Sequence, residues 1–162
     1  KNKDKNLLYT THTQINLMKN DDLLFELGVS GAYRYVNSLS MNTIYSANQL
    51  ITGNDFRFGF EMQLHYKEFC LQSEYDQANI KNDHAWGYYI LADYSFTKNI
   101  QVAFEVEKFS DFQATTSDNE WYGIGLNYYF TERTKMMTDF RTQFSSIKNN
   151  YLGEVQFQVF LN

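Results

Sequence analysis

The chain has 162 residues, a formal net charge of −5, a single cysteine and no proline. The acidic balance argues against a general affinity for nucleic acid, and one cysteine excludes an internal disulfide. No stretch of about 20 apolar residues is present, so the sequence predicts no transmembrane helix. The absence of proline suits long, uninterrupted strands, because proline lacks the N–H group that a sheet needs.

The length fits one domain, which we place over residues 1–162. The chain does not begin with methionine and shows no signal peptide. We therefore expect a mature or excised part of a longer protein.

Apolar and polar residues alternate along almost the whole chain, and this period of two predicts β-strands. Within residues 85–96, Trp86, Ile90 and Tyr94 fall on one face, whereas Asp93 falls on the other. The same alternation predicts nine strands, at 6–18, 22–37, 55–66, 68–79, 85–96, 100–109, 120–130, 135–146 and 151–162.

The predicted connections alternate in length along the chain. The tight ones are 18–22, 66–68, 96–99 and 130–134. The longer, polar ones are 37–54, 80–84, 110–119 and 146–150. Strands joined by tight turns are antiparallel neighbours, so the sequence predicts an up-and-down meander with short turns at one end.

Short turns at one end and longer loops at the other are typical of transmembrane β-barrels. Spanning strands need about 9–11 residues, and the predicted strands are long enough. The lipid-facing side must be apolar, with aromatic residues near the membrane interfaces. Aromatic pairs that would form such a belt flank three tight turns: Tyr66 and Phe69, Tyr94 and Phe96, and Tyr128 and Phe130. The predicted fold class is all-β, an antiparallel up-and-down transmembrane β-barrel.

A soluble β-sandwich or ligand-binding barrel is the alternative, because its strands also alternate, with the apolar face turned inward. Soluble folds usually have strands of about 5–6 residues and often carry proline in their loops. The long strands and the missing proline favour lipid as the solvent of the apolar face.

The complementary face of the predicted strands is polar and charged. If it faces a lumen, so many carboxylates require water rather than a packed core, which indicates a pore for small hydrophilic solutes or ions. The candidate pore-lining residues are Arg34, Arg57, Glu61, Glu74, Asp76, Asp93, Glu105, Glu107, Asp139, Arg141 and Glu154. We expect lateral pairs such as Arg141 with Asp139 or Glu154. For any one residue, the alternative is that its charge only braces and hydrates the wall.

Several phrases of the sequence resemble the phosphate-selective porin O and P family. They are FRFGFEMQLHYKEFCLQSEYDQANI (56–80), GYYILADYSFTKN (87–99), WYGIGLNYYFTERTKMMTDFRTQF (121–144) and the closing VQFQVFLN. Their order matches the C-terminal half of that family. The resemblance implies a sixteen-stranded barrel in the bacterial outer membrane, often a homotrimer, that passes anions such as phosphate or pyrophosphate.

Two features depart from that family. Nine strands are too few for the barrel, so we expect the remaining N-terminal strands, or another partner, to complete it, since open sheet edges are not tolerated in lipid. The candidate lumen set is also acidic, whereas an anion-selective pore favours arginine or lysine.

Other chemistry finds little support in the sequence. The three histidines, at 12, 65 and 84, are isolated in the sequence, and no pair of histidines or cysteines has the spacing of metal ligands. We therefore expect no metal site and no cofactor. Cys70 lies on the lumen-side register beside no basic residue and is expected to be inert. We expect no enzymatic activity. The alternative function is a structural or interaction barrel within a larger outer-membrane assembly.

Overall fold

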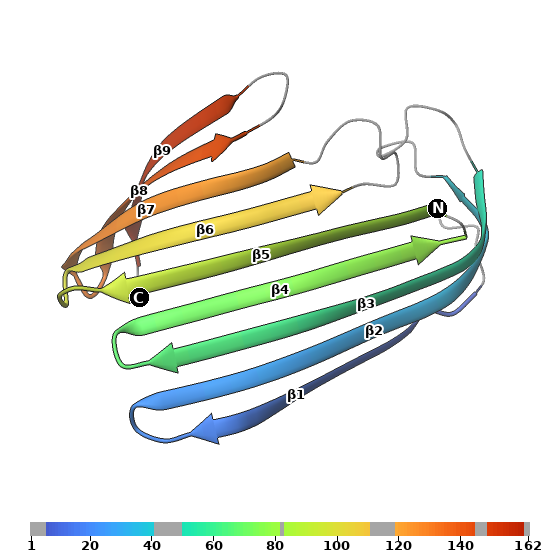
Figure 1. Cartoon of the computed structure of the whole chain (residues 1–162), viewed down its shortest axis with the longest axis horizontal. Coiled ribbons are helices and arrows are strands. Elements are labelled where there is room, and N and C mark those ends of the chain that lie inside the picture. Colours follow the sequence, from blue (N-terminus) through green and yellow to red (C-terminus); the bar gives the residue numbers. More distant parts are fainter. Residues whose placement is uncertain (1–5, 41–49, 82, 111–118, 145–148, 161–162) are drawn as a thin grey trace.

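A computed structural model describes residues 6–40, 50–81, 83–110, 119–144 and 149–160. These residues form nine strands and no helix. The strands are β1 (Tyr9–Lys19), β2 (Leu23–Ser40), β3 (Leu50–Tyr66), β4 (Phe69–Ile80), β5 (Asp83–Ser95), β6 (Ile100–Ser110), β7 (Asn119–Thr131), β8 (Thr134–Gln143) and β9 (Asn150–Val159). They make one sheet in chain order, and each strand is antiparallel to the next. The predicted nine-strand meander is confirmed (Figure 1).

The register keeps the two faces separate across the whole sheet. Directly opposed residues share a face, and apolar residues oppose apolar ones, as in Ile90 with Val106 and Phe104 with Ile124. Because a slip of one residue would exchange the faces of a strand, the alternation in the sequence itself fixes this register.

Short polar side chains form the tight turns at one end of the sheet. Asn20 Oδ1 accepts hydrogen bonds from the backbone N–H groups of Asp22 and Leu23, at 3.1 and 2.8 Å. Thr97 Oγ1 does the same for Asn99 and Ile100, at 3.2 and 3.1 Å. Such local bonds favour a turn over continued strand pairing.

Two predicted loops are shorter in the structure, which corrects the sequence analysis. Strand β2 extends to Ser40 and strand β3 begins at Leu50, so both strands reach into the predicted loop 37–54. Only residues 81 and 82 separate β4 from β5, where a longer loop was predicted over 80–84. There Ile80 pairs with Asp83, and Lys81 adopts a positive φ of 58°, so the hairpin continues to its tip. The predicted strand ends at 145–146 and 161–162 lie outside the described residues.

A bulge in β1 corrects the predicted face of Leu17. The register shifts between Asn16 and Met18, so that Met18 opposes Phe25 on the apolar face. The period of two along the predicted strand 6–18 would instead place Leu17 in the same row as Ile15. An extra residue in one strand is what a β-bulge inserts, and alternation alone does not reveal it.

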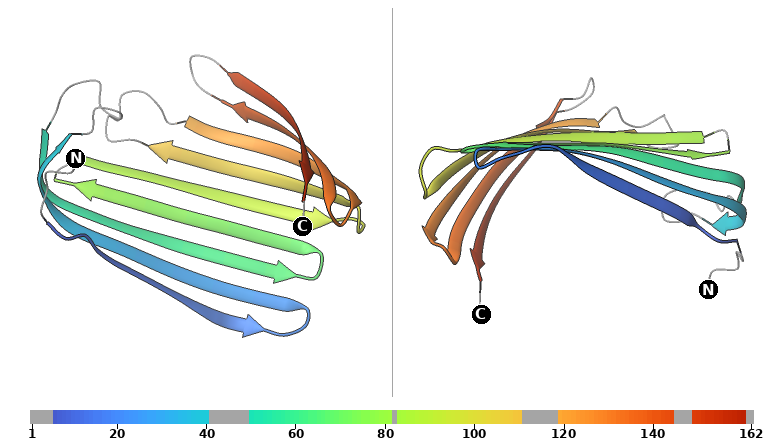
Figure 2. Two further views of the ribbon diagram at one scale, coloured as in Figure 1. Left: turned by 180° about the vertical axis from the view of Figure 1, so that it is seen from behind. Right: turned by 90° about the horizontal axis from the view of Figure 1, so that it is seen from below.

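The sheet is a single arched layer whose two edge strands, β1 and β9, bend toward the same side (Figure 2, right). In the middle of β5, β6 and β7 the polar-face residues are the less exposed ones. The side chain of Glu105 is 25% exposed, whereas Phe104 beside it is 56% exposed. A concave face brings side chains together, so the polar face lies inside the arch. Closure of this sheet into a barrel of sixteen strands stays a prediction.

No helix among the described residues is long and apolar enough to cross a membrane.

Candidate functional site: the polar face of the sheet

All eleven candidate residues lie on one face of the sheet. The pairings place Glu61 opposite Glu74, Gly59 opposite Asp76, and Asp139 opposite Glu154. The same face holds apolar residues near the loop end, including Trp121 opposite Glu107. The shared face follows from the period of two in the strands. That these residues line a pore stays a prediction.

One buried carboxylate joins two arginines near the end of the sheet that carries the longer loops. Asp55 is 1% exposed. Its Oδ2 accepts a hydrogen bond from Arg34 Nε at 2.8 Å, and its Oδ1 accepts one from Arg57 Nε at 2.9 Å. Arg57 Nη2 also donates to Oδ2 at 2.9 Å. Both arginines are thus engaged by one carboxylate, with charge-assisted hydrogen bonds that are stronger than neutral ones.

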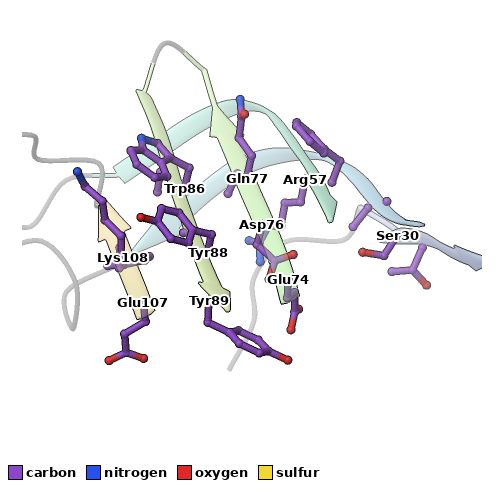
Figure 3. Close-up of a pocket in the computed structure, with 18 of the residues that line it drawn as sticks. Ser30, Arg57, Glu74, Asp76, Gln77, Trp86, Tyr88, Tyr89, Glu107 and Lys108 are labelled. Carbon is purple, nitrogen blue, oxygen red and sulfur yellow. The ribbon is translucent and has the colours of Figure 1, made fainter. Parts of the chain in front are cut away.

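A second cluster, at the middle of β3 and β4, is acidic. Glu61 and Glu74 are direct partners across the two strands, and Asp76 follows Glu74 on the same face. The nearest basic group recorded for them is His12, whose Nδ1 lies 3.6 Å from Glu61 Oε1. Figure 3 shows Glu74 and Asp76 close together, with Tyr89 on the neighbouring strand. Like charges directly opposite each other repel. Among the described residues, no arginine or lysine lies within 4.0 Å of these carboxylates, so the cluster keeps a net negative charge.

The third cluster surrounds Arg141 on β8. Its Nη2 lies 3.3 Å from Glu105 Oε2, its Nη1 lies 3.8 Å from Glu107 Oε1, and its Nε lies 3.9 Å from Asp139 Oδ1. Gly123 stands between Arg141 and Glu105 in the register, and its missing side chain leaves space for the arginine to reach across β7. The expected pair with Asp139 is present but longer than the pair with Glu105.

Amides and hydroxyls connect β5, β6 and β7 near the tight turns. Gln101 Nε2 donates to Asp93 Oδ1 at 2.6 Å. Gln101 Oε1 accepts from Asn127 Nδ2 at 2.9 Å and from the Tyr129 hydroxyl at 3.0 Å. This network fixes the side chains of three strands relative to one another.

A hollow of about 890 Å³ is lined by residues of both faces. Its polar-face lining includes Glu74, Asp76 and Tyr89, and its other lining includes Trp86 and Tyr88 (Figure 3). Because the described sheet is one layer thick, this hollow is not an enclosed cavity for a ligand. A smaller one of about 140 Å³ lies over the acidic cluster, lined by polar-face residues such as Gln14, Glu26 and Gln72.

The expectation that no basic residue stands beside Cys70 on its face of the sheet is wrong. His65, its direct partner on β3, places Nε2 at 3.6 Å from the thiol sulfur. The same His65 nitrogen contacts the amide of Gln63. The pairing of strands, rather than proximity in sequence, brings the imidazole to the thiol. In the described part of the chain, no three His, Cys, Asp or Glu residues are arranged to hold a metal ion.

The opposite face carries two aromatic belts. Near the tight turns, ring centroids lie 4.9 Å apart in Tyr94–Phe96 and in Tyr128–Phe130. Near the loop end, an aromatic row crosses β3, β4 and β5, with neighbouring centroids 5.9 to 6.5 Å apart. Its members are Phe56, Phe58, Tyr75, Trp86 and Tyr88.

The residues between these two belts are mostly aliphatic and exposed. Ile90, Ile124 and Leu126 are 43 to 48% exposed. Among the described strand residues of this face, the charged side chains lie at the belt of the loop end, where Lys108 is the register partner of the belt residue Tyr88 and Glu120 is the partner of Lys108. There Glu120 Oε1 accepts hydrogen bonds from the hydroxyls of Tyr122 and Tyr88, at 2.9 and 3.3 Å. The face thus has an apolar band bounded by aromatic residues on both sides.

The candidate set omits several charged residues of the polar face, namely Lys19, Glu26, Asp55 and Lys135. Asp55 is the carboxylate that engages Arg34 and Arg57, and its place two residues before Arg57 was the signal that could have found it. Lys135 opposes Tyr129 on this face, and its Nζ lies 5.8 Å from the centroid of that ring. Lys135 lies four residues before Asp139 in β8, so the period of two places both on the same face, and this was the signal in the sequence that could have found it.

Replacing Arg141 by glutamine is expected to lower the free energy of unfolding by about 1 kcal/mol, because three carboxylates lose their shared counter-charge on a partly exposed surface. Chemical denaturation in detergent measures this change. The control is Arg133→Gln, which removes an arginine from an exposed turn. Equal stability of both variants and the parent would show that the Arg141 cluster contributes nothing to the fold.

No family model, curated protein or solved structure matches this chain. The resemblance to the phosphate-selective porins therefore stays a prediction.

Proposed function

We propose that this chain forms part of the wall of an outer-membrane channel for the passive diffusion of small hydrophilic solutes or ions. The observation that carries this proposal is the division of the sheet into an exposed apolar band with aromatic borders and a charged opposite face. Water disfavours such a wide exposed apolar surface, whereas lipid requires one. The charged side requires water.

The distance between the aromatic belts supports a membrane-spanning sheet. On β3, Tyr66 and Phe56 are ten residues apart, and about 9–11 tilted residues cross the hydrocarbon core. The strands themselves run from 10 to 18 residues. Further strands would close the wall, since an open edge in hydrocarbon leaves backbone groups unpaired.

Two adjacent residues on opposite faces allow a direct test. In a Cys70→Ser background, Glu105→Cys and Phe104→Cys are each exposed to a water-soluble, membrane-impermeant thiol reagent in native membranes. We expect Glu105→Cys to be labelled and Phe104→Cys to be protected, although Phe104 is the more exposed side chain of the two in the sheet. Denaturation in SDS should then make both cysteines react equally.

The possible outcomes separate the candidate functions. Labelling of Phe104→Cys as readily as Glu105→Cys would contradict a lipid-facing band. Recovery of the protein in the soluble fraction without detergent would favour a soluble β-protein. Protection of both cysteines, with no conductance in planar bilayers, would favour a plugged structural barrel of a larger assembly.

A further inference from the structure

We infer that the channel favours cations over anions; this inference rests on the proposed channel function and names the class of solute that the polar face accepts. Two observations support it: the charges of the whole polar face, and the carboxylates that engage each arginine on that face. The alternative solute class is the anions implied by the resemblance to the phosphate-selective porins.

Acidic residues dominate the polar face of the described strands. The acidic ones are Glu26, Asp55, Glu61, Glu74, Asp76, Asp93, Glu105, Glu107, Asp139 and Glu154. The basic ones, apart from histidines, are Arg34, Arg57, Lys135, Arg141 and, at the tight-turn end of β1, Lys19. A wall with this excess of carboxylates raises the local concentration of cations in the water beside it.

The arginines of this face are already engaged by carboxylates. Arg34 and Arg57 share Asp55, which leaves one excess positive charge at the loop end. Arg141 lies within 4 Å of oxygens from three acidic residues. An anion passing these arginines would compete with fixed carboxylates, so they do not form a ladder for phosphate.

The acidic cluster of Glu61, Glu74 and Asp76 lies between those two arginine sites, and no arginine or lysine in the described part of the chain forms an ion pair with it. The side chain of Glu61 is 41% exposed, and Asp76 is also exposed. Water and mobile ions therefore reach both carboxylates. His12 is its nearest recorded basic group and is charged only when protonated. A passing cation therefore meets its strongest attraction midway along the strands.

The test measures the reversal potential of the complete channel in planar bilayers across a gradient of KCl. We expect a permeability ratio of K⁺ to Cl⁻ above one. In the variant E61Q/E74Q/D76N the ratio should fall about twofold or more, because three charges leave the wall. Raising both KCl concentrations should weaken the preference, since the screening length is about 10 Å at 0.1 M and 3 Å at 1 M.

The control variant is D21N/D22N/E132Q, which removes the same charge from the tight turns and should keep the parent ratio. A parent channel that prefers Cl⁻ would overturn the inference while leaving the channel function intact. A cation preference that E61Q/E74Q/D76N leaves unchanged would also overturn it. Absence of any conductance would instead contradict the proposed function itself. Single-channel conductance of each variant confirms that a folded channel is being compared.

Discussion

Replacing Ile124 by arginine is expected to lower the stability of the protein in a bilayer by about 2–4 kcal/mol, the cost of a basic side chain at the membrane midplane of a β-barrel. Ile124 lies midway along β7, between Phe104 and Phe140 in the register, and is 48% exposed. Unfolding in urea from lipid vesicles measures the change.

The control for this prediction is Tyr128→Arg, four residues nearer the tight turn on the same face. At the depth of the aromatic belt the cost should fall to about 0–1 kcal/mol. In a water-soluble protein both arginines would instead be tolerated within about 0.5 kcal/mol, because exposed substitutions rarely cost more. Equal effects at the two positions would thus contradict the depth of the apolar band that we propose.

Replacing Asp55 by alanine is expected to lower the free energy of unfolding by about 3 kcal/mol, the lower end of the range for breaking a buried ion pair. Asp55 is 1% exposed, so its removal leaves the guanidinium of Arg34, which is 19% exposed, without a counter-charge. The lower end applies because the side chain of Arg57 is 48% exposed and water partly replaces its partner.

Two further variants check the cause of that loss. Asp76→Ala removes an exposed carboxylate from the same face and should change stability by no more than about 0.5 kcal/mol. The double variant Asp55→Leu with Arg34→Met replaces buried charges by apolar groups and should recover part of the loss. If Asp55→Ala and Asp76→Ala were equally stable, the buried carboxylate would have no role in holding the loop end of the sheet.

The strands and their order followed from the sequence because a period of two marks a two-faced strand directly. The face of every candidate residue followed from the same pattern, as with Glu105 and Glu107. The bulge at Leu17 and the tight connection after Ile80 did not follow. Both depend on how neighbouring strands pair. At the bulge the register shifts by one residue, and after Ile80 the pairing continues beyond the end of the alternation.

The partners of the charged residues were harder to predict than their face. Arg141 reaches Glu105 and Glu107 across β7, a contact that needs the register of three strands and the space beside Gly123. His65 meets Cys70 for the same reason. The alternation along one strand predicts the face on which a residue lies. Its neighbours on that face depend on the register between strands, which the alternation does not specify.

The first and last strands of the sheet run in the same direction, since the count of alternating strands is nine. This parity restricts any ring built from the sheet. A ring whose neighbours are all antiparallel has an even number of strands, so an odd number must be inserted between β9 and β1. Two copies inserted with the same orientation would meet along parallel seams, and joining β9 to β1 directly would give one parallel seam as well.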